Sequence, residues 1–96
     1  MAWVYILECS DRSYYTGSTV DLERRLVEHN KGVGANFTRE RRPVRIVFAA
    51  ETDSIATAFE WEKKIQGWSR AKKLALIEGR MSDLPALSAR GYRSGA

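Results

Sequence analysis

Two β-rich runs that face each other across a short polar segment constrain the fold of this chain most. Residues 3–9 and 13–17 are rich in β-branched and aromatic side chains, and the polar segment SDRS joins them. This pattern is typical of a β-hairpin. Arg12 stands where a short loop often needs a positive φ angle, which glycine adopts more easily than arginine.

Tyrosines occupy both arms of this hairpin, and the loop length decides which of them share a face. Side chains alternate along a strand, so a shift of one residue exchanges the two faces. If Leu7 stands opposite Tyr15, then Tyr5 and Tyr15 share one face. A loop of even length gives that place to Tyr14 instead. The residues alone leave both registers open.

Capping residues, glycines and prolines divide the rest of the chain into further elements. The segment 31–43 holds two glycines, a proline and four positive charges, and we expect it to be an exposed loop. The other expected elements are a helix at 21–30, a largely buried strand at 44–51, a helix from 55 up to Gly67, and a helix from about 70 to 78.

The length of 96 residues suits a single compact domain. Residues 80–96 have weak periodicity and several Gly, Ser and Ala residues. We therefore expect one domain over residues 1–79, followed by a C-terminal tail over 80–96 that is partly disordered.

The composition is typical of a soluble globular protein, with 44% hydrophobic and 29% charged residues. No apolar run approaches the roughly 20 residues that cross a bilayer, and the first residues lack the basic leader of a secretory signal. We therefore expect a cytoplasmic protein with no membrane partner. Cys9 is the only cysteine, so no internal disulfide can form. The net charge of +4 favours a polyanionic partner.

Ionisable residues share the apolar stripe of the first expected helix. Leu22, Arg25, Leu26 and His29 stand at i, i+3, i+4 and i+7 and thus on one face. Arg24 falls on the far side. We therefore expect Arg25 and His29 at or along the edge of the core, and Arg24 in solvent.

The helix that follows Ser54 places a carboxylate on its apolar stripe. Glu62 lies near the centre of that stripe, whereas Glu60 falls outside it. A buried ion costs several kcal/mol unless it is paired or solvated. The other members of this stripe are Ile55, Ala58, Phe59, Ile65 and Gln66.

Two arrangements satisfy these charges. In one, Arg25 and Glu62 form a buried salt bridge that fixes how the helices pack. In the other, both line a hollow at the sheet edge together with His29 and the hairpin phenols. That hollow suits a phosphate, because arginine clamps anionic oxygens and a carboxylate holds a Mg²⁺-like cation that keeps most of its waters. A nearby positive charge lowers the pKa of a tyrosine and makes proton transfer through it easier.

Basic residues gather in two places, where they either follow a phosphate backbone or form a solvated face. The first group flanks the expected loop and the second surrounds the junction of the last two helices. They are Arg39, Arg41, Arg42 and Arg45 in the first group, and Lys63, Lys64, Arg70, Lys72 and Lys73 in the second.

These motifs in this order resemble the GIY-YIG endonuclease superfamily over about residues 3–79. VYI at 4–6 and YTG at 15–17 stand for the two tripeptides of the family name. GSTVDLERRLVEHNKG matches the family's first-helix pattern of an arginine followed four positions later by histidine. AFEWEKKIQGW resembles the later helix that carries its metal-binding glutamate. The whole chain is most similar to the small stand-alone bacterial YhbQ-like proteins.

The resemblance implies an α+β fold, in which a three-stranded antiparallel sheet is flanked by helices. It also implies hydrolysis of DNA phosphodiester bonds with one divalent cation, Mg²⁺ or Mn²⁺, and the odd-loop register that brings Tyr5 and Tyr15 together. By resemblance, Tyr5 is the general base or activates the water, Tyr15 positions the phosphate or the water, and Arg25 binds the scissile phosphate. His29 assists proton transfer or orients Tyr5, and Glu62 holds the metal.

The chain departs from the family pattern at four positions. Val4 and Thr16 replace the glycine and isoleucine of the family name, at places remote from the phenols. Gln66 stands where relatives often have lysine, and Phe37 where many have tyrosine. We expect the last two to affect DNA contact more than chemistry.

Three functions follow from these alternatives. The first is a metal-dependent DNA endonuclease whose preferred DNA, double-stranded, branched or single-stranded, the sequence does not define. The second is a DNA-binding module with the same site and little or no catalytic activity, to which the basic residues at 39, 41, 42, 63, 64, 72 and 73 contribute. The third is a structural protein in which Arg25 and Glu62 merely pair.

Overall fold

The structure, a computed structural model, describes residues 1–79 and 88–89, and its first two strands form the predicted hairpin. β1 (Ala2–Glu8) pairs antiparallel with β2 (Tyr14–Thr19). Leu7 stands opposite Tyr15, which is the register of the odd-length loop. Arg12 has a φ angle of 71°, as its place in the loop predicts.

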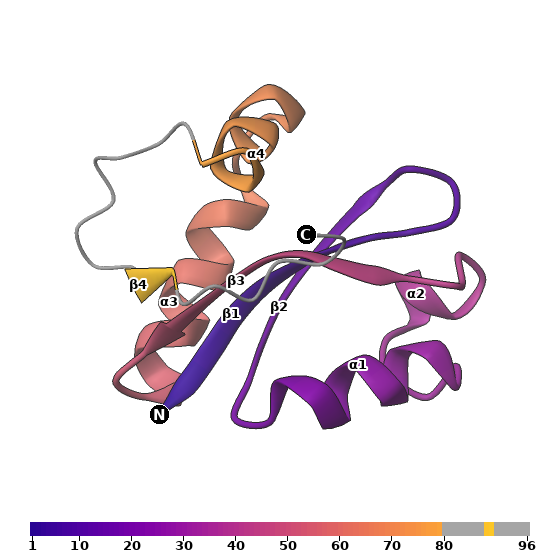
Figure 1. Ribbon diagram of the computed structural model, residues 1–96, viewed down its shortest axis with the longest axis horizontal. Coiled ribbons are helices and arrows are strands. Elements are labelled where there is room, and N and C mark those ends of the chain that lie inside the picture. The colour runs from indigo at the N-terminus through magenta and orange to yellow at the C-terminus, as the bar shows by residue number, and fades with distance from the viewer. Residues whose placement is uncertain (80–87, 90–96) are drawn as a thin grey trace.

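The sheet is antiparallel and has β1 near its centre. β3 (Arg45–Thr52) pairs with the side of β1 that β2 leaves free. β4 (Ser88–Ala89) adds two residues beside β3, so the strand order is β2-β1-β3-β4 (Figure 1). The expected three-stranded antiparallel sheet is confirmed, and β4 extends it. The rest of the predicted tail, 80–87 and 90–96, lies outside the described residues, so the domain boundary at residue 79 stays a prediction.

Within the described residues, three of the four helices begin at a side-chain cap. The side chains of Asp21, Ser54 and Ser69 each accept a hydrogen bond from a backbone N–H of the first turn. None of these helices is long and apolar enough to span a bilayer. The helices are α1 (Leu22–Asn30), α2 (Asn36–Arg39), α3 (Ile55–Gln66) and α4 (Arg70–Ile77).

The segment 31–43 is not entirely a loop, because it contains the four-residue helix α2. Ala35 at its N-cap makes no side-chain capping bond, so the sequence carries no start signal there. The buried side chain of Thr38 instead contacts His29 of α1 at 2.8 Å. α2 therefore depends on a tertiary contact, which local sequence patterns do not reveal.

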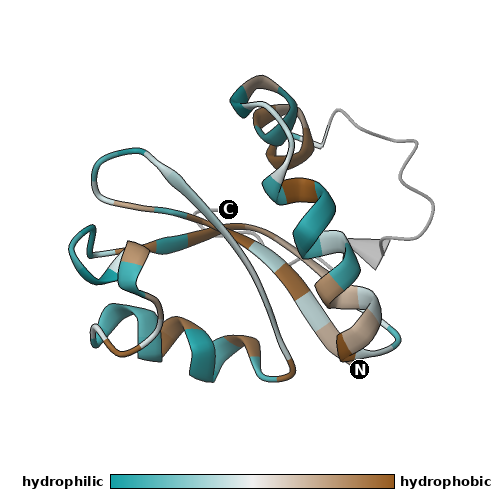
Figure 2. Cartoon of the chain, turned by 180° about the vertical axis from the view of Figure 1, so that it is seen from behind, coloured by the Kyte–Doolittle hydropathy of each residue, from teal (hydrophilic) through white to brown (hydrophobic). Residues whose placement is uncertain are grey.

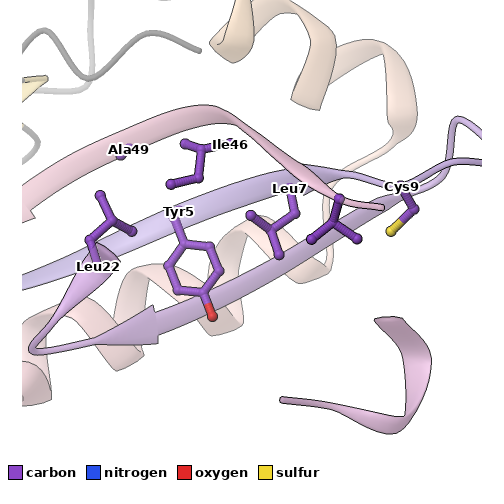
Figure 3. Packing of buried hydrophobic residues seen from close by; sticks show 7 residues of the cluster. Tyr5, Leu7, Cys9, Leu22, Ile46 and Ala49 are labelled. Atoms are coloured by element: carbon purple, nitrogen blue, oxygen red, sulfur yellow. The ribbon is translucent and has the colours of Figure 1, made fainter. Parts of the chain in front are cut away.

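Helices cover both faces of the sheet, with α1 and α2 on one side and α3 and α4 on the other (Figure 1). The cluster on the first face joins Tyr5 of β1 with Leu22 of α1, and Figure 3 shows the Tyr5 oxygen pointing away from the aliphatic side chains. The cluster on the second face joins Ile6 with Ile65 and Leu76. Hydrophobic and hydrophilic residues alternate along α1 and α3 (Figure 2), as amphipathic helices require.

The buried stripe of α3 is narrower than the sequence predicts. Ala58 and Ile65 are fully buried, but Ile55 and Phe59 are 47% and 49% exposed. Trp61 packs against the second cluster in their place. The helix thus meets the sheet along positions 58, 61 and 65, and the side of α3 that carries Phe59 faces solvent.

Candidate active site

The phenols of Tyr5 and Tyr15 lie on the α1 face of the sheet, as the register predicts. Tyr5 stands opposite Gly17 in the neighbouring strand. A Cβ atom at Gly17 would lie 2.5 Å from the Tyr5 oxygen and 3.2 Å from the Tyr15 ring. Gly17 therefore provides the space in which the Tyr5 ring crosses β2.

His29 joins the two phenols from the buried side of α1. It is fully buried, and its Nε2 lies 3.0 Å from the Tyr5 oxygen. The edge of its ring meets Tyr15 with 5.2 Å between the ring centroids. The other ring nitrogen, Nδ1, lies 2.8 Å from the Thr38 hydroxyl. The apolar stripe of α1 thus contributes a histidine whose two nitrogens are both engaged, as a buried polar group requires.

Arg25 lies beside the Tyr5 phenol but forms its salt bridge within α1. Its Nη1 lies 3.0 Å from an Oε atom of Glu28, one turn further along the helix. The Arg25 side chain is 31% exposed. Glu62 makes its hydrogen bonds elsewhere, so the structure does not contain the buried Arg25–Glu62 salt bridge that the sequence leaves open. Arg24 is 76% exposed, as predicted.

Glu62 reaches the site along the edge strand β2. Ser18 donates a hydrogen bond to its Oε1 at 2.6 Å, and the Gln66 amide donates to its Oε2 at 2.9 Å. Gln66 also lies 3.4 Å from the Thr16 carbonyl. Glu62 is only partly buried. The carboxylate therefore comes from the helix layer opposite to Arg25 and His29, and it is held by two neutral donors.

Burial raises the pKa of both phenols, contrary to the direction that the sequence suggests. The pKa of Tyr5 rises to about 12, mainly because burial disfavours the phenolate, and Arg25 only partly offsets this effect. The pKa of Tyr15 is raised by burial and then by the nearby Glu62 carboxylate. The pKa of His29 falls to about 4 through burial and the Arg25 charge. At neutral pH the phenols are therefore protonated and the imidazole is uncharged.

A hollow of about 250 Å³ lies beside these groups. Its walls include the polar side chains of Ser18, Arg24, Arg25 and Glu28. The hollow includes Ser18, the hydrogen-bond partner of Glu62, in its wall, but neither Glu62 nor the two phenols line it. It gives an anionic oxygen access to Arg25 from solvent.

The donor set near Glu62 suits a hydrated cation better than a protein cage. Residues 1–79 and 88–89 contain no group of three or more His, Cys, Asp or Glu side chains that could enclose a metal ion. Mg²⁺ often binds through one or two carboxylates and keeps several waters, with substrate phosphates completing its shell. A single partly exposed glutamate beside a hollow is compatible with that mode.

The basic residues that the sequence singles out have partners within the protein. Arg41 pairs with Asp11 at 3.1 Å, and Arg42 donates to the Arg39 carbonyl at 2.7 Å. On α3 and α4, lysines cover aromatic rings at 4.3 to 4.8 Å from the ring centroids. These pairs are Lys63 with Phe59, Lys64 with Trp61 and Lys72 with Trp68, whereas Lys73 is only partly exposed.

Sequence analysis does not identify four groups that hold the predicted site residues. Glu28 is detectable in principle, because its spacing from Arg25 is that of a helical ion pair. Ser18, Gln66 and Thr38 act as hydrogen-bond partners across the fold, and no local pattern assigns them this part.

The chain is similar to several known proteins. The family model described as the GIY-YIG catalytic domain matches residues 1–75. A UPF0213 protein of Syntrophus aciditrophicus is 51% identical over 77 residues, which are 79% of this chain and 88% of that protein. A UPF0213 protein of Halobacterium salinarum is 49% identical over 77 residues, 80% of this chain and all of that protein. The solution NMR structure of a UPF0213 protein from Bacillus halodurans covers 86% of this chain and 89% of its own, with a TM-score of 0.54 and 42% identity.

Proposed function

Because the chain belongs to the GIY-YIG catalytic-domain family, we propose that it is a metal-dependent endonuclease that hydrolyses DNA phosphodiester bonds. The observation that carries this proposal is the contact of Tyr5 with His29 and Arg25, beside the second phenol of Tyr15. Hydrolysis of a phosphodiester needs in-line positioning, stabilisation of negative charge and an activated water. These side chains can supply the first two and can move the proton of the third.

Arg25 binds the scissile phosphate from the side of the hollow. Its guanidinium is partly exposed, and its pKa is raised by Glu28, so it stays charged. A guanidinium can donate two parallel hydrogen bonds to phosphate oxygens. The Tyr15 ring contacts that of His29, with 5.2 Å between the ring centroids, and its phenol positions a phosphate oxygen or the attacking water.

Tyr5 and His29 handle the proton of that water. The attacking water gives a proton to the Tyr5 oxygen while the phenolic proton of Tyr5 passes to Nε2 of His29, 3.0 Å away. Tyr5 then stays neutral and the positive charge develops on His29, whose pKa of about 4 in the free protein makes it a weak acceptor. The negative charge of a phosphate bound at Arg25 raises the pKa of the imidazole and so favours this transfer.

Glu62 is the residue that would hold the divalent cation, Mg²⁺ or Mn²⁺. When bound, such a cation stabilises negative charge on the phosphate oxygens and favours deprotonation of nearby water. Ser18 and Gln66 each donate a hydrogen bond to this carboxylate and hold it in place.

DNA binding by the α3–α4 side is part of the proposal. Lys63, Lys64 and Lys72 each lie over an aromatic ring, and basic groups of this kind bind a phosphate backbone with an affinity that falls as salt rises. The basic residues of the 31–43 segment directly follow α1 in sequence and serve the same purpose on the α1 side of the sheet. They are Arg39, Arg41 and Arg42.

The test is cleavage of supercoiled plasmid with Mg²⁺ or Mn²⁺ by the protein and two matched variants. Glu62→Gln keeps the size of the side chain but removes its charge and one of its two acceptor oxygens, and we expect it to abolish nicking. Glu60→Gln on the same helix, at an exposed position, is the control and should cleave normally. If the two variants cleave the plasmid equally well, Glu62 is not part of the active site.

A second function is favoured by the protonation states of the free protein. Tyr5 and His29 are both neutral, and Gln66 already donates a hydrogen bond to Glu62. Both features suit a DNA-binding module that retains the site with little or no catalytic activity. Salt-dependent DNA binding with no product under either metal would select this function.

A further inference from the structure

Thr38 is a buried polar residue that no role in the proposed reaction uses. It belongs to the short helix α2 and is fully buried. Its hydroxyl contacts two groups, Nδ1 of His29 at 2.8 Å and the Ala35 carbonyl at 3.0 Å. These contacts together limit where the protons of this network can lie.

A hydroxyl has one proton to donate, and a carbonyl can only accept. The Thr38 hydroxyl donates to the Ala35 carbonyl, which has two lone pairs and also accepts from the Arg39 N–H at 3.1 Å. The Thr38 oxygen is then left to accept a hydrogen bond. In this arrangement Nδ1 of His29, 2.8 Å away, supplies it and carries the imidazole proton.

The other end of the imidazole leads to the same assignment. Arg25, which lies beside the Tyr5 oxygen, carries only donor groups and so cannot accept the phenolic proton. The phenolic proton of Tyr5 needs an acceptor, and Nε2 of His29 lies 3.0 Å away. Nε2 can accept only if it carries no proton. Both ends of the ring therefore favour the same neutral tautomer.

The backbone before α2 holds the ring in this orientation. A Cβ atom at Gly34 would lie 2.5 Å from Nδ1 of His29 and 2.9 Å from its Cα. The chain thus packs against the imidazole at Gly34 and returns four residues later to place Thr38 on Nδ1. Only a residue without a side chain permits the first approach.

We propose that Thr38 is a positioning residue that holds His29 in the tautomer protonated at Nδ1, which leaves Nε2 bare to accept the phenolic proton of Tyr5. The consequence for catalysis rests on the proposed function, but the tautomer itself does not. In the opposite tautomer, the Nε2 proton would point at the Tyr5 oxygen and the phenol would have no route for its proton to His29.

NMR spectroscopy tests the tautomer directly, because His29 is the only histidine of the chain. In ¹⁵N-labelled, tag-free protein at neutral pH, long-range ¹H–¹⁵N correlations distinguish a protonated ring nitrogen from a bare one. We expect Nδ1 to be protonated and Nε2 to be bare. The opposite pattern in the unmodified protein would overturn the proposal, whatever the variants do.

The variants then ask whether Thr38 is responsible. Thr38→Ser keeps the hydroxyl and should keep the tautomer, whereas Thr38→Val removes it at nearly equal volume and should yield the Nε2-protonated form or a mixture. Thr16→Val is the control, because the Thr16 hydroxyl is also buried but has no hydrogen-bond partner in the described part of the chain. An unchanged Nδ1-protonated ring in Thr38→Val would refute the role of Thr38.

DNA cleavage gives the second readout. Thr38→Val should lower the rate by about tenfold to a hundredfold, as loss of an orienting partner of a functional histidine typically does, and Thr38→Ser should restore it. A shifted tautomer with an unchanged rate would overturn the catalytic consequence. If the unmodified protein cleaves no DNA, the proposed function fails and the NMR result still decides the tautomer. If Thr38→Val does not fold, the unmodified protein still decides the tautomer, and Thr38→Ala, which also lacks the hydroxyl, takes its place in testing the role of Thr38.

Discussion

The Ser18 hydroxyl donates to Oε1 of Glu62 at 2.6 Å and joins the edge strand β2 to α3, 44 positions away in sequence. Ser18→Ala leaves Gln66 as the remaining donor to this carboxylate. Because such partners orient a ligating group, we expect Mn²⁺ to bind about tenfold to a hundredfold more weakly, as measured by electron paramagnetic resonance titration. Ser10→Ala, on the exposed hairpin loop, is the control and should bind normally. If both variants bind Mn²⁺ with equal affinity, Ser18 does not contribute to metal binding.

Gly17 and Gly67 are glycines with opposite surroundings. Gly17→Ala puts a Cβ atom 2.5 Å from the Tyr5 oxygen, so we expect it to displace the phenol, to reduce cleavage strongly and to destabilise the fold by about 1–3 kcal/mol. In Gly67→Ala the nearest atom is 3.5 Å away, and its φ of −82° suits alanine. That variant should be neutral or more stable by about 0.4–1 kcal/mol. Urea denaturation and plasmid nicking compare the two, and equal stability loss would contradict the contact at Gly17.

Protonation of His29 should destabilise the protein at mildly acidic pH. Its pKa is about 4 in the fold against 6.5 in the unfolded chain, so below pH 6.5 the unfolded state binds more protons. The free energy of unfolding should be greatest above pH 6.5 and should fall by about 3 kcal/mol in all as the pH drops toward 4.

Urea denaturation at intervals between pH 7.5 and 4.5 measures this slope. The carboxyl groups of Asp11 and Glu28 have lowered pKa values and titrate below that window. His29→Asn should therefore remove the pH dependence between 6.5 and 4.5, while lowering stability at pH 7.5. A slope that persists in the variant would assign it to another group.

The lysines of α3 and α4 should contribute to the salt dependence of DNA binding. Lys64→Gln and Lys72→Gln each remove one cation that lies over a partly buried tryptophan. If each contacts a phosphate, the slope of log affinity against log salt should become shallower by about 1 per substitution. Fluorescence anisotropy with a labelled DNA duplex between low and moderate salt measures the slope. Lys31→Gln, at the C-terminal end of α1, is the control, and a slope that falls equally in all three variants would argue against a specific surface.

The parts of the fold that local patterns define are the parts that sequence predicts well. Strand runs, caps and helical stripes are short-range properties, and they locate β1, β2, β3, α1, α3 and α4 close to their observed bounds. The choice between the two hairpin registers required the family resemblance, and the pairing of Leu7 with Tyr15 confirms it. The sequence does not predict α2, because Ala35 at its N-cap provides no capping side chain.

The candidate site could be predicted only in its principal side chains. Helical geometry places Arg25 and His29 on the inward stripe, but it does not distinguish an Arg25–Glu62 pair from the observed pair with Glu28. The sequence suggests a lowered pKa for Tyr5, whereas in the structure this pKa is raised. The cause is the burial of the phenol, which depends on how the sheet packs and cannot be read from nearby charges. Hydrogen-bond partners such as Ser18 also depend on the packed structure, because they lie far in sequence from the residues that they hold.

Glu62 lies on α3, across the sheet from Arg25 and His29 on α1. The candidate site therefore takes its residues from the helices on both faces of the sheet. A partly folded chain with only the hairpin and α1 in place would retain its phosphate-binding groups while lacking the acidic ligand. Under the proposed function, chemical competence would thus require α3 to be docked on the sheet, and molecules without that docked helix would carry no complete cutting centre.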